Sequence, residues 1–100
     1  MKIPKQVTVG KKKIEVLQYK TVTIGKQACR GSYHTLEKKI RLAKKDLQGN
    51  TFTKNERSET FWHELTHAIL HDMNHKLTFN EKFVIGFSQR LDQAIRSAKF

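Results

Sequence analysis

The chain has 100 residues, of which 20 are Lys or Arg and 9 are Asp or Glu, and its formal net charge is +11. This length predicts a single domain, residues 1–100, with a modest core. Cys29 is the only cysteine, which excludes an intramolecular disulfide, and no apolar stretch approaches the length of a membrane span. The residues after Met1 contain no apolar signal-peptide core, so we expect a cytoplasmic protein without a membrane segment.

The positive charge favours nucleic acid, an acidic protein or an anionic surface as a partner. Lys and Arg cluster at residues 11–13, 38–45 and 90–99. We expect weak, non-specific binding to nucleic acid that falls steeply with salt. A surface that is merely soluble and strongly charged accounts for the composition equally well.

The first half of the chain shows the alternation of β-strands. Val7 and Val9 alternate with polar residues, and residues 10–13 predict a turn. Residues 14–24 are rich in β-branched and aromatic side chains and predict one strand or two short ones, with an irregularity near Leu17.

Two further segments predict a β-hairpin. Residues 28–34 have strand character, and residues 39–43 alternate so that Ile40 and Leu42 face the core. We expect residues 32–34 to pair with residues 40–42, and a polar loop to follow over residues 45–52.

A helix is predicted from residue 54 to residue 73. Thr53-Lys54-Asn55-Glu56 matches the capping box, and no Gly or Pro interrupts the segment that follows. Apolar residues recur at helical spacing and predict one buried stripe, made of Phe61, Trp62, Leu65, Ala68, Ile69 and Met73.

A second helix is predicted to follow and to reach the C-terminus. Thr78-Phe79-Asn80-Glu81 repeats the capping-box pattern. The predicted buried stripe consists of Val84, Phe87, Leu91, Ala94, Ile95 and Ala98. Two helices with a short connection pack antiparallel. We therefore expect an α+β fold, a small antiparallel or mixed sheet of about three to four strands followed by a helical hairpin.

The strongest chemical signal is His63-Glu64-Leu65-Thr66-His67. Two histidines four residues apart project from the same face of a helix, where one zinc ion can bind both. This is the H-E-x-x-H pattern of zinc peptidases, in which the glutamate is the general base. A chance pattern on a surface helix is the alternative explanation.

A catalytic zinc usually takes three protein ligands. On a straight helix His71 lies ~12 Å along the axis from His63, too far for metal–nitrogen bonds of ~2 Å. Glu81 is the predicted third ligand, because it begins the next helix and the antiparallel return brings it towards His67. The alternative role of Glu81 is that of the acid in the capping box of Thr78.

Residues 61–71, followed by Asn80-Glu81 at the start of an amphipathic helix, resemble the gluzincin branch of the zincin metallopeptidases. The closest in style are the ImmA/IrrE-type peptidases and the minigluzincins of bacteria and phages. Residues 31–42 are similar to the strand pair that precedes the motif helix in that group. The resemblance implies that an edge strand near residues 39–43 or 32–34 binds an extended peptide. The chain departs from those families in its short spacing between His67 and Glu81 and in having no separate recognition domain.

The sequence thus predicts a zinc-dependent endopeptidase that cleaves intracellular protein or peptide substrates. His63, His67 and Glu81 are the predicted zinc ligands and Glu64 is the catalytic base. Tyr33, His34 and His71 are the candidates for stabilising the oxyanion or supporting the ligands. The alternative function is a nucleic-acid-binding or acidic-partner-binding protein with a structural or vestigial zinc site. The excess of Lys and Arg favours this alternative, whereas an open fourth position at the metal favours an enzyme.

Overall fold

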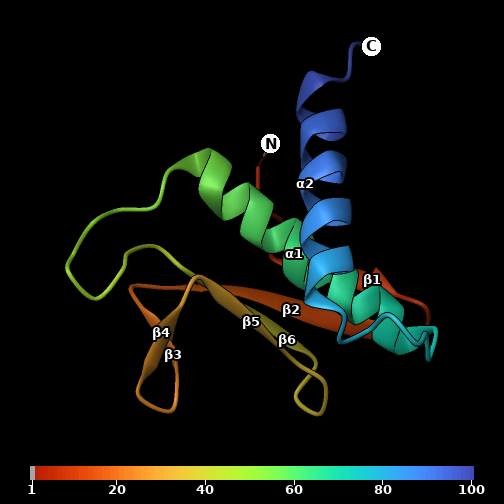
Figure 1. The fold of residues 1–100 in the computed structure, drawn as a ribbon, viewed down its shortest axis with the longest axis horizontal. Coiled ribbons are helices and arrows are strands. Elements are labelled where there is room, and N and C mark those ends of the chain that lie inside the picture. Colours follow the sequence, from red (N-terminus) through yellow and green to blue (C-terminus); the bar gives the residue numbers. More distant parts are fainter. Residues whose placement is uncertain (1) are drawn as a thin grey trace.

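The computed structural model describes residues 2–100 and contains six strands followed by two helices. The elements are β1 (Gln6–Val9), β2 (Lys12–Tyr19), β3 (Val22–Ile24), β4 (Gln27–Cys29), β5 (Gly31–His34), β6 (Lys39–Ala43), α1 (Lys54–Asp72) and α2 (Glu81–Ser97). The helix α1 lies across the sheet, and α2 runs back alongside α1 (Figure 1). The expected α+β fold is confirmed. None of the helices in residues 2–100 is long and apolar enough to cross a membrane.

The main sheet has the strand order β1-β2-β6-β5 and is mixed, because β2 and β6 are parallel while the other pairs are antiparallel. The predicted β5–β6 hairpin is confirmed, with Tyr33 opposite Ile40. Its position leaves β5 at one edge of the sheet.

The segment expected as one strand over residues 28–34 is instead two strands, β4 and β5, separated at Arg30. The strands β3 and β4 pair with each other as a separate two-stranded sheet. Residues 14–24 likewise divide into β2 and β3, the second of the two predicted arrangements. Local β propensity does not distinguish one long strand from two strands that pair with different partners.

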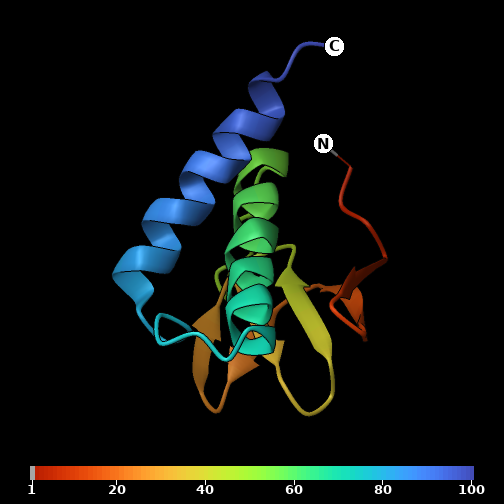
Figure 2. The same cartoon turned by 90° about the vertical axis from the view of Figure 1, so that its right-hand side faces the viewer.

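One face of the main sheet is covered by α1 (Figure 2). The alternation in β6 produces this arrangement, because Ile40 and Leu42 are fully buried on the side of the helix. They join Ile14 from β2 and Phe61 and Leu65 from α1 in one apolar cluster. The cluster fixes the height and rotation of α1 above the sheet, and therefore the direction in which the motif side chains point.

The capping box at the start of α1 is confirmed. The amide of Glu56 donates to Thr53 Oγ1 at 3.1 Å, and the amide of Thr53 donates to Glu56 Oε1 at 3.0 Å.

The predicted buried stripe of α1 is partly wrong, since Ile69 and Met73 are 40% and 62% exposed. The helix is covered by the sheet and by α2 on different sides, so its buried surface includes Glu64 and does not follow one apolar line.

The predicted capping box at the start of α2 is wrong. Asn80 is the N-cap, and its Oδ1 accepts from the amide of Phe83 at 3.0 Å. The hydroxyl of Thr78 donates to the carbonyl of His75 instead. The carboxylate of Glu81 is therefore not used in a box with Thr78.

The predicted buried stripe of α2 is largely wrong. Val84 is buried and Leu91 half-buried, but the other residues of the stripe are exposed, namely Phe87, Ala94, Ile95 and Ala98. Only Val84, Ser88 and Asp92 are buried on this helix, and they face α1 at a spacing of four residues. Asp92 accepts from Ser58 Oγ of α1 at 2.6 Å and forms an ion pair with Arg96 at 2.8 Å. Two of the three residues that α2 buries against α1 are thus polar, and the aromatic rings of Phe83 and Phe87 lie on another side of the helix.

Candidate metal centre and catalytic site

The structure brings the three predicted ligands together. His63 and His67 lie one turn apart on α1, and Glu81 is the first residue of α2. One ligand atom from each residue lies within 4.8 Å of the others, and this group could hold a metal ion. His63 Nε2 is 3.2 Å from Glu81 Oε2, and His67 Nε2 is 2.8 Å from Glu81 Oε1.

The hydrogen bonds of His67 favour a cation at this point. His67 Nδ1 lies 2.7 Å from the carbonyl oxygen of Thr78, which can only accept, so Nδ1 carries the hydrogen. In the neutral ring Nε2 is then unprotonated and presents its lone pair to the carboxylate of Glu81. The contact between Nε2 and the Glu81 carboxylate becomes favourable when a cation binds to both groups, or when Nε2 carries a second proton of the ring. Histidines that bind a metal through one ring nitrogen typically donate a hydrogen bond from the other ring nitrogen to a backbone carbonyl, as Nδ1 of His67 does here.

Burial lowers the pKa of His63 below its usual value, and the nearby Glu81 carboxylate opposes this effect. Its ring meets that of His67 edge to face, with the centroids 4.9 Å apart. A lowered pKa favours the neutral imidazole, which is the form that binds metal ions.

Glu64 lies beside the ligands and is only 7% exposed. The pKa of its carboxyl is raised to about 7, chiefly by burial, while the charge of His67 lowers it and the charge of Glu81 raises it. Its Oε2 is buried and forms no hydrogen bond within residues 2–100. A carboxylate with these properties is a competent proton acceptor near neutral pH.

We expect the metal-free protein to lose stability as the pH rises from about 4.5 to about 7. In this range the folded state still binds the Glu64 proton while the unfolded state has released it, so a rising pH favours unfolding. The difference between the ordinary and the raised pKa of Glu64 corresponds to a loss of roughly 3 kcal/mol in the free energy of unfolding. Urea denaturation with a chelator at about pH 5 and about pH 8 measures the effect, and Glu64→Gln is the control that lacks it. Identical pH profiles for the two proteins would contradict the assignment.

A cleft of about 370 Å³ opens beside Glu64, between α1, α2 and the start of β5. Gly31 of β5 lies in its wall, and a Cβ at this position would be 2.6 Å from Thr60 Cγ2 and 2.9 Å from the carbonyl oxygen of Arg41. Only glycine therefore allows β5 to approach α1 this closely. Sequence reasoning did not assign a role to Gly31, although a glycine within a strand often marks a close approach of this kind.

The three candidate supporting residues lie in two different places. The rings of Tyr33 and His71 are in edge contact, with their centroids 6.3 Å apart, on the side of the sheet that faces α1. His34 alternates with Tyr33 along β5 and so points to the opposite face, where its ring nitrogen lies 3.0 Å from Ser32 Oγ. Within residues 2–100, no hydrogen bond joins any of the three to the candidate ligands.

The Thr78 carbonyl is the other functional group that sequence reasoning missed. It is a main-chain atom, so no side-chain pattern marks it, and the loop between the helices places it against His67.

Comparison of the chain with protein-family models, curated proteins and solved structures found no match. The geometry of His63, Glu64, His67 and Glu81 therefore carries the functional argument.

Proposed function

We propose that the protein is a zinc-dependent endopeptidase. The observation that supports this most directly is the convergence of two imidazoles and one carboxylate within 4.8 Å, with the buried carboxylate of Glu64 beside them. Two histidines and a glutamate are a ligand set of catalytic zinc, which keeps one position open, whereas structural zinc is usually closed by four protein ligands.

In this proposal each residue has a separate task. A zinc ion held by His63, His67 and Glu81 would polarise the scissile carbonyl and lower the pKa of a water molecule in the site. Glu64 accepts the proton of the attacking water and then donates it to the leaving amine. The burial that raises the pKa of Glu64 suits it to both transfers, because a carboxyl with a pKa of about 7 exchanges a proton easily at neutral pH.

The edge strand β5 supports a peptide as the substrate. On either side of Tyr33, the carbonyl of Arg30 accepts from the amide of Ala43 in β6, and the carbonyl of His34 accepts from the amide of Lys38 just before β6, at 2.8 Å each. Hydrogen-bonding groups alternate between the two sides of an antiparallel strand, so the N–H and C=O of Tyr33 face the open edge of the sheet. An extended peptide paired with this edge lies beside the cleft that contains Glu64.

The competing function is a binding protein with a structural or vestigial metal site, and the net charge of +11 is the observation in its favour. A binding protein has no need for the buried carboxylate of Glu64. Burying an ionisable group without a partner costs stability, which is the usual sign of a functional residue. We therefore rank the peptidase first and keep weak nucleic-acid binding as a secondary property.

The test is cleavage of a mixed library of unstructured peptides, read by mass spectrometry as new termini. We expect the zinc-loaded protein to produce new termini, the chelated protein to produce none, and added zinc to restore them. His34→Ala is the matched histidine control, because His34 points away from the site, and we expect it to retain full zinc-dependent cleavage. Cleavage that persists in the metal-free protein would contradict the proposal.

A further inference from the structure

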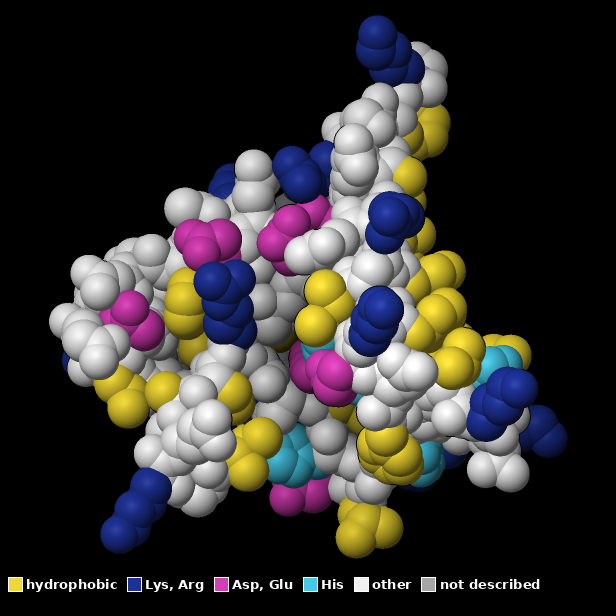
Figure 3. Space-filling view, viewed as in Figure 1, with side chains coloured by type: hydrophobic (Ala, Val, Ile, Leu, Met, Phe, Trp, Pro, Cys, Tyr) yellow, Lys and Arg dark blue, Asp and Glu magenta, His cyan; other side chains and the backbone are white. Residues whose placement is uncertain are grey.

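The helix α2 exposes its apolar side to solvent. Phe87 is 48% and Ile95 is 44% exposed, and Phe79, just before the helix, is 84% exposed. Phe83 stacks on Phe87 with the ring centroids 5.7 Å apart. Phe83 and Phe87 lie one turn apart on the helix and Phe79 lies just before it, so these three aromatic side chains form one short stripe, which we call the outer face of α2. Ile95 is about 120° further round the helix from Phe83, on the side of Val84. Hydrophobic side chains follow this side of the helix in Figure 3.

This stripe is unusual for the surface of a small folded domain. An amphipathic helix normally turns its apolar side to the core, whereas α2 turns Val84, Ser88 and Asp92 to α1 and leaves the aromatic side uncovered. A contiguous exposed apolar patch of this kind marks an interaction surface.

A shallow groove lies on the outer face. It has a volume of about 560 Å³ and runs over Leu77, Phe83, Gly86 and Phe87. The guanidinium of Arg90 lies over Gly86, since its Nη1 donates to the Gly86 carbonyl at 2.9 Å and would be 3.3 Å from a Cβ at this position. The groove therefore offers another helix an apolar surface, the rings of Phe83 and Phe87, with the guanidinium of Arg90 beside it.

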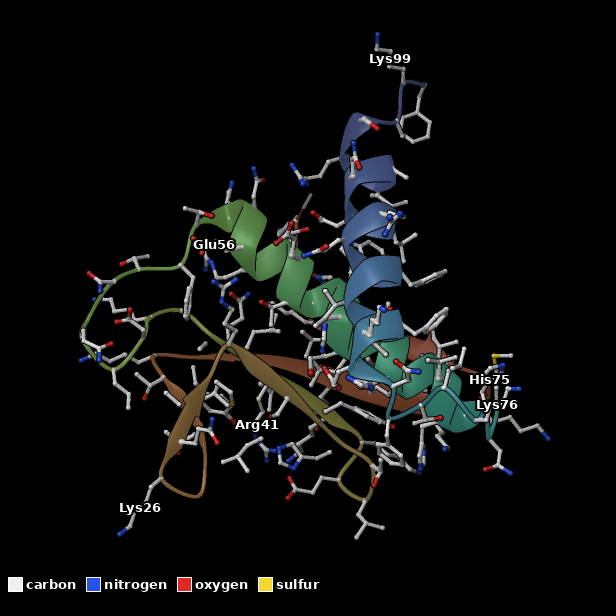
Figure 4. The ribbon with its side chains drawn as sticks, in the orientation of Figure 1. Lys26, Arg41, Glu56, His75, Lys76 and Lys99 are labelled. Carbon is white, nitrogen blue, oxygen red and sulfur yellow. The ribbon has the colours of Figure 1, made fainter. Side chains whose placement is uncertain are left out.

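The charge around the stripe has one sign. Lys82 and Arg90 line the groove, and no acidic residue does. The two acidic side chains of α2 are engaged elsewhere, Glu81 with the histidines of α1 and Asp92 with Ser58 and Arg96. Lys76, in the loop before α2, and Lys99, after its last turn, add positive charge near the two ends (Figure 4).

We propose that the outer face of α2 is a docking surface for an acidic amphipathic helix of a partner protein. Such a helix places its apolar side chains on the rings of Phe83 and Phe87, and its carboxylates beside Lys82 and Arg90. A second copy of the chain is a poorer occupant, because each copy carries a net charge of +11 and presents the same cations. Nucleic acid is also poorer, because Phe83 and Phe87 stack on each other instead of offering open rings to bases.

The experiment uses a small set of fluorescent synthetic helical peptides of about 18 residues, with Leu at positions i, i+3, i+4 and i+7 and Glu on the flanks. We expect binding by fluorescence anisotropy that weakens as salt increases. Phe87→Gln and Arg90→Glu should each raise the Kd at least about tenfold. Leu36→Gln is the matched control, because Leu36 is 96% exposed in the β5–β6 turn, and it should leave the Kd unchanged. Circular dichroism verifies that each variant is folded.

Four outcomes would overturn the docking proposal. These are no binding by any acidic peptide at about 100 μM, equal binding by peptides with scrambled Leu positions, an equal loss in Leu36→Gln, and single-stranded DNA that displaces the peptide and whose own binding is weakened by Phe87→Gln. Self-association of the protein alone, seen by sedimentation and abolished by Phe87→Gln, would assign the surface to a second copy instead. The readout does not use peptidase activity, so it is independent of the proposed enzyme function.

Discussion

Replacement of Glu81 by glutamine is expected to lower the affinity of the protein for zinc by more than about a hundredfold. Removing a residue that only hydrogen-bonds to a metal ligand already costs about 10–100-fold in affinity, and Glu81 is itself a proposed ligand. The amide is nearly isosteric but lacks the negative charge that now faces both imidazoles at 2.8 and 3.2 Å. His63→Ala and His67→Ala should have the same effect, because each removes one nitrogen donor from the group.

Competition with a chromophoric chelator measures this affinity directly. The melting temperature provides a second readout, since zinc at about 100 times its Kd stabilises a folded protein by about 2.7 kcal/mol. Two variants are matched controls that should retain stoichiometric zinc. His71→Ala removes the next histidine of α1, and Glu59→Gln changes a carboxylate in the wall of the cleft. A His71 variant without zinc, beside a zinc-replete Glu81 variant, would overturn the ligand assignment.

The elements of the fold that local patterns specify were predictable from the sequence. The alternation around Ile40 and Leu42 predicted the β5–β6 hairpin, and Thr53 with Glu56 predicted the start of α1. The parallel pairing of β2 with β6 was not predictable, because it depends on contacts between segments far apart in the chain.

The outer face of α2 shows a different limit of sequence reasoning. Helical periodicity identified an apolar side of α2, including Phe87 and Ile95, and the structure leaves both exposed. Periodicity tells which residues share a face, and it does not tell which surface covers that face. The polar pair Ser58–Asp92 holds α2 against α1 by its other side.

The candidate site was largely predictable because its chemistry depends on spacing. Two histidines four apart meet on any helix, and a carboxylate at the start of the returning helix was the nearest third donor. The Thr78 carbonyl was not predictable, since its role depends on the conformation of a loop. The same holds for the close contact at Gly31, which depends on how β5 and α1 approach each other.

Replacement of Glu64 by glutamine is expected to give a folded, zinc-binding protein that is at least about a hundredfold slower on any substrate of the wild type. The amide has nearly the volume of the carboxyl, so the buried position of Glu64 remains filled. The three candidate ligands are unchanged, so zinc binding should persist. Only the proton acceptor is lost, and such a group typically contributes about 10²–10⁴ in rate.

The comparison requires one substrate that the wild type cleaves, with kcat/KM and zinc content measured on the same preparations. A loss in kcat with little change in KM is expected, because Glu64 acts on the proton in the transition state and does not hold the peptide. The matched control is Glu37→Gln, which makes the same chemical change in the exposed β5–β6 turn, outside the cleft, and should retain most of the activity. Equal turnover by wild type and Glu64→Gln, with contaminating protease excluded, would remove Glu64 from the mechanism. It would also remove the main support for a peptidase, because the buried carboxylate beside three metal donors would then have no catalytic task.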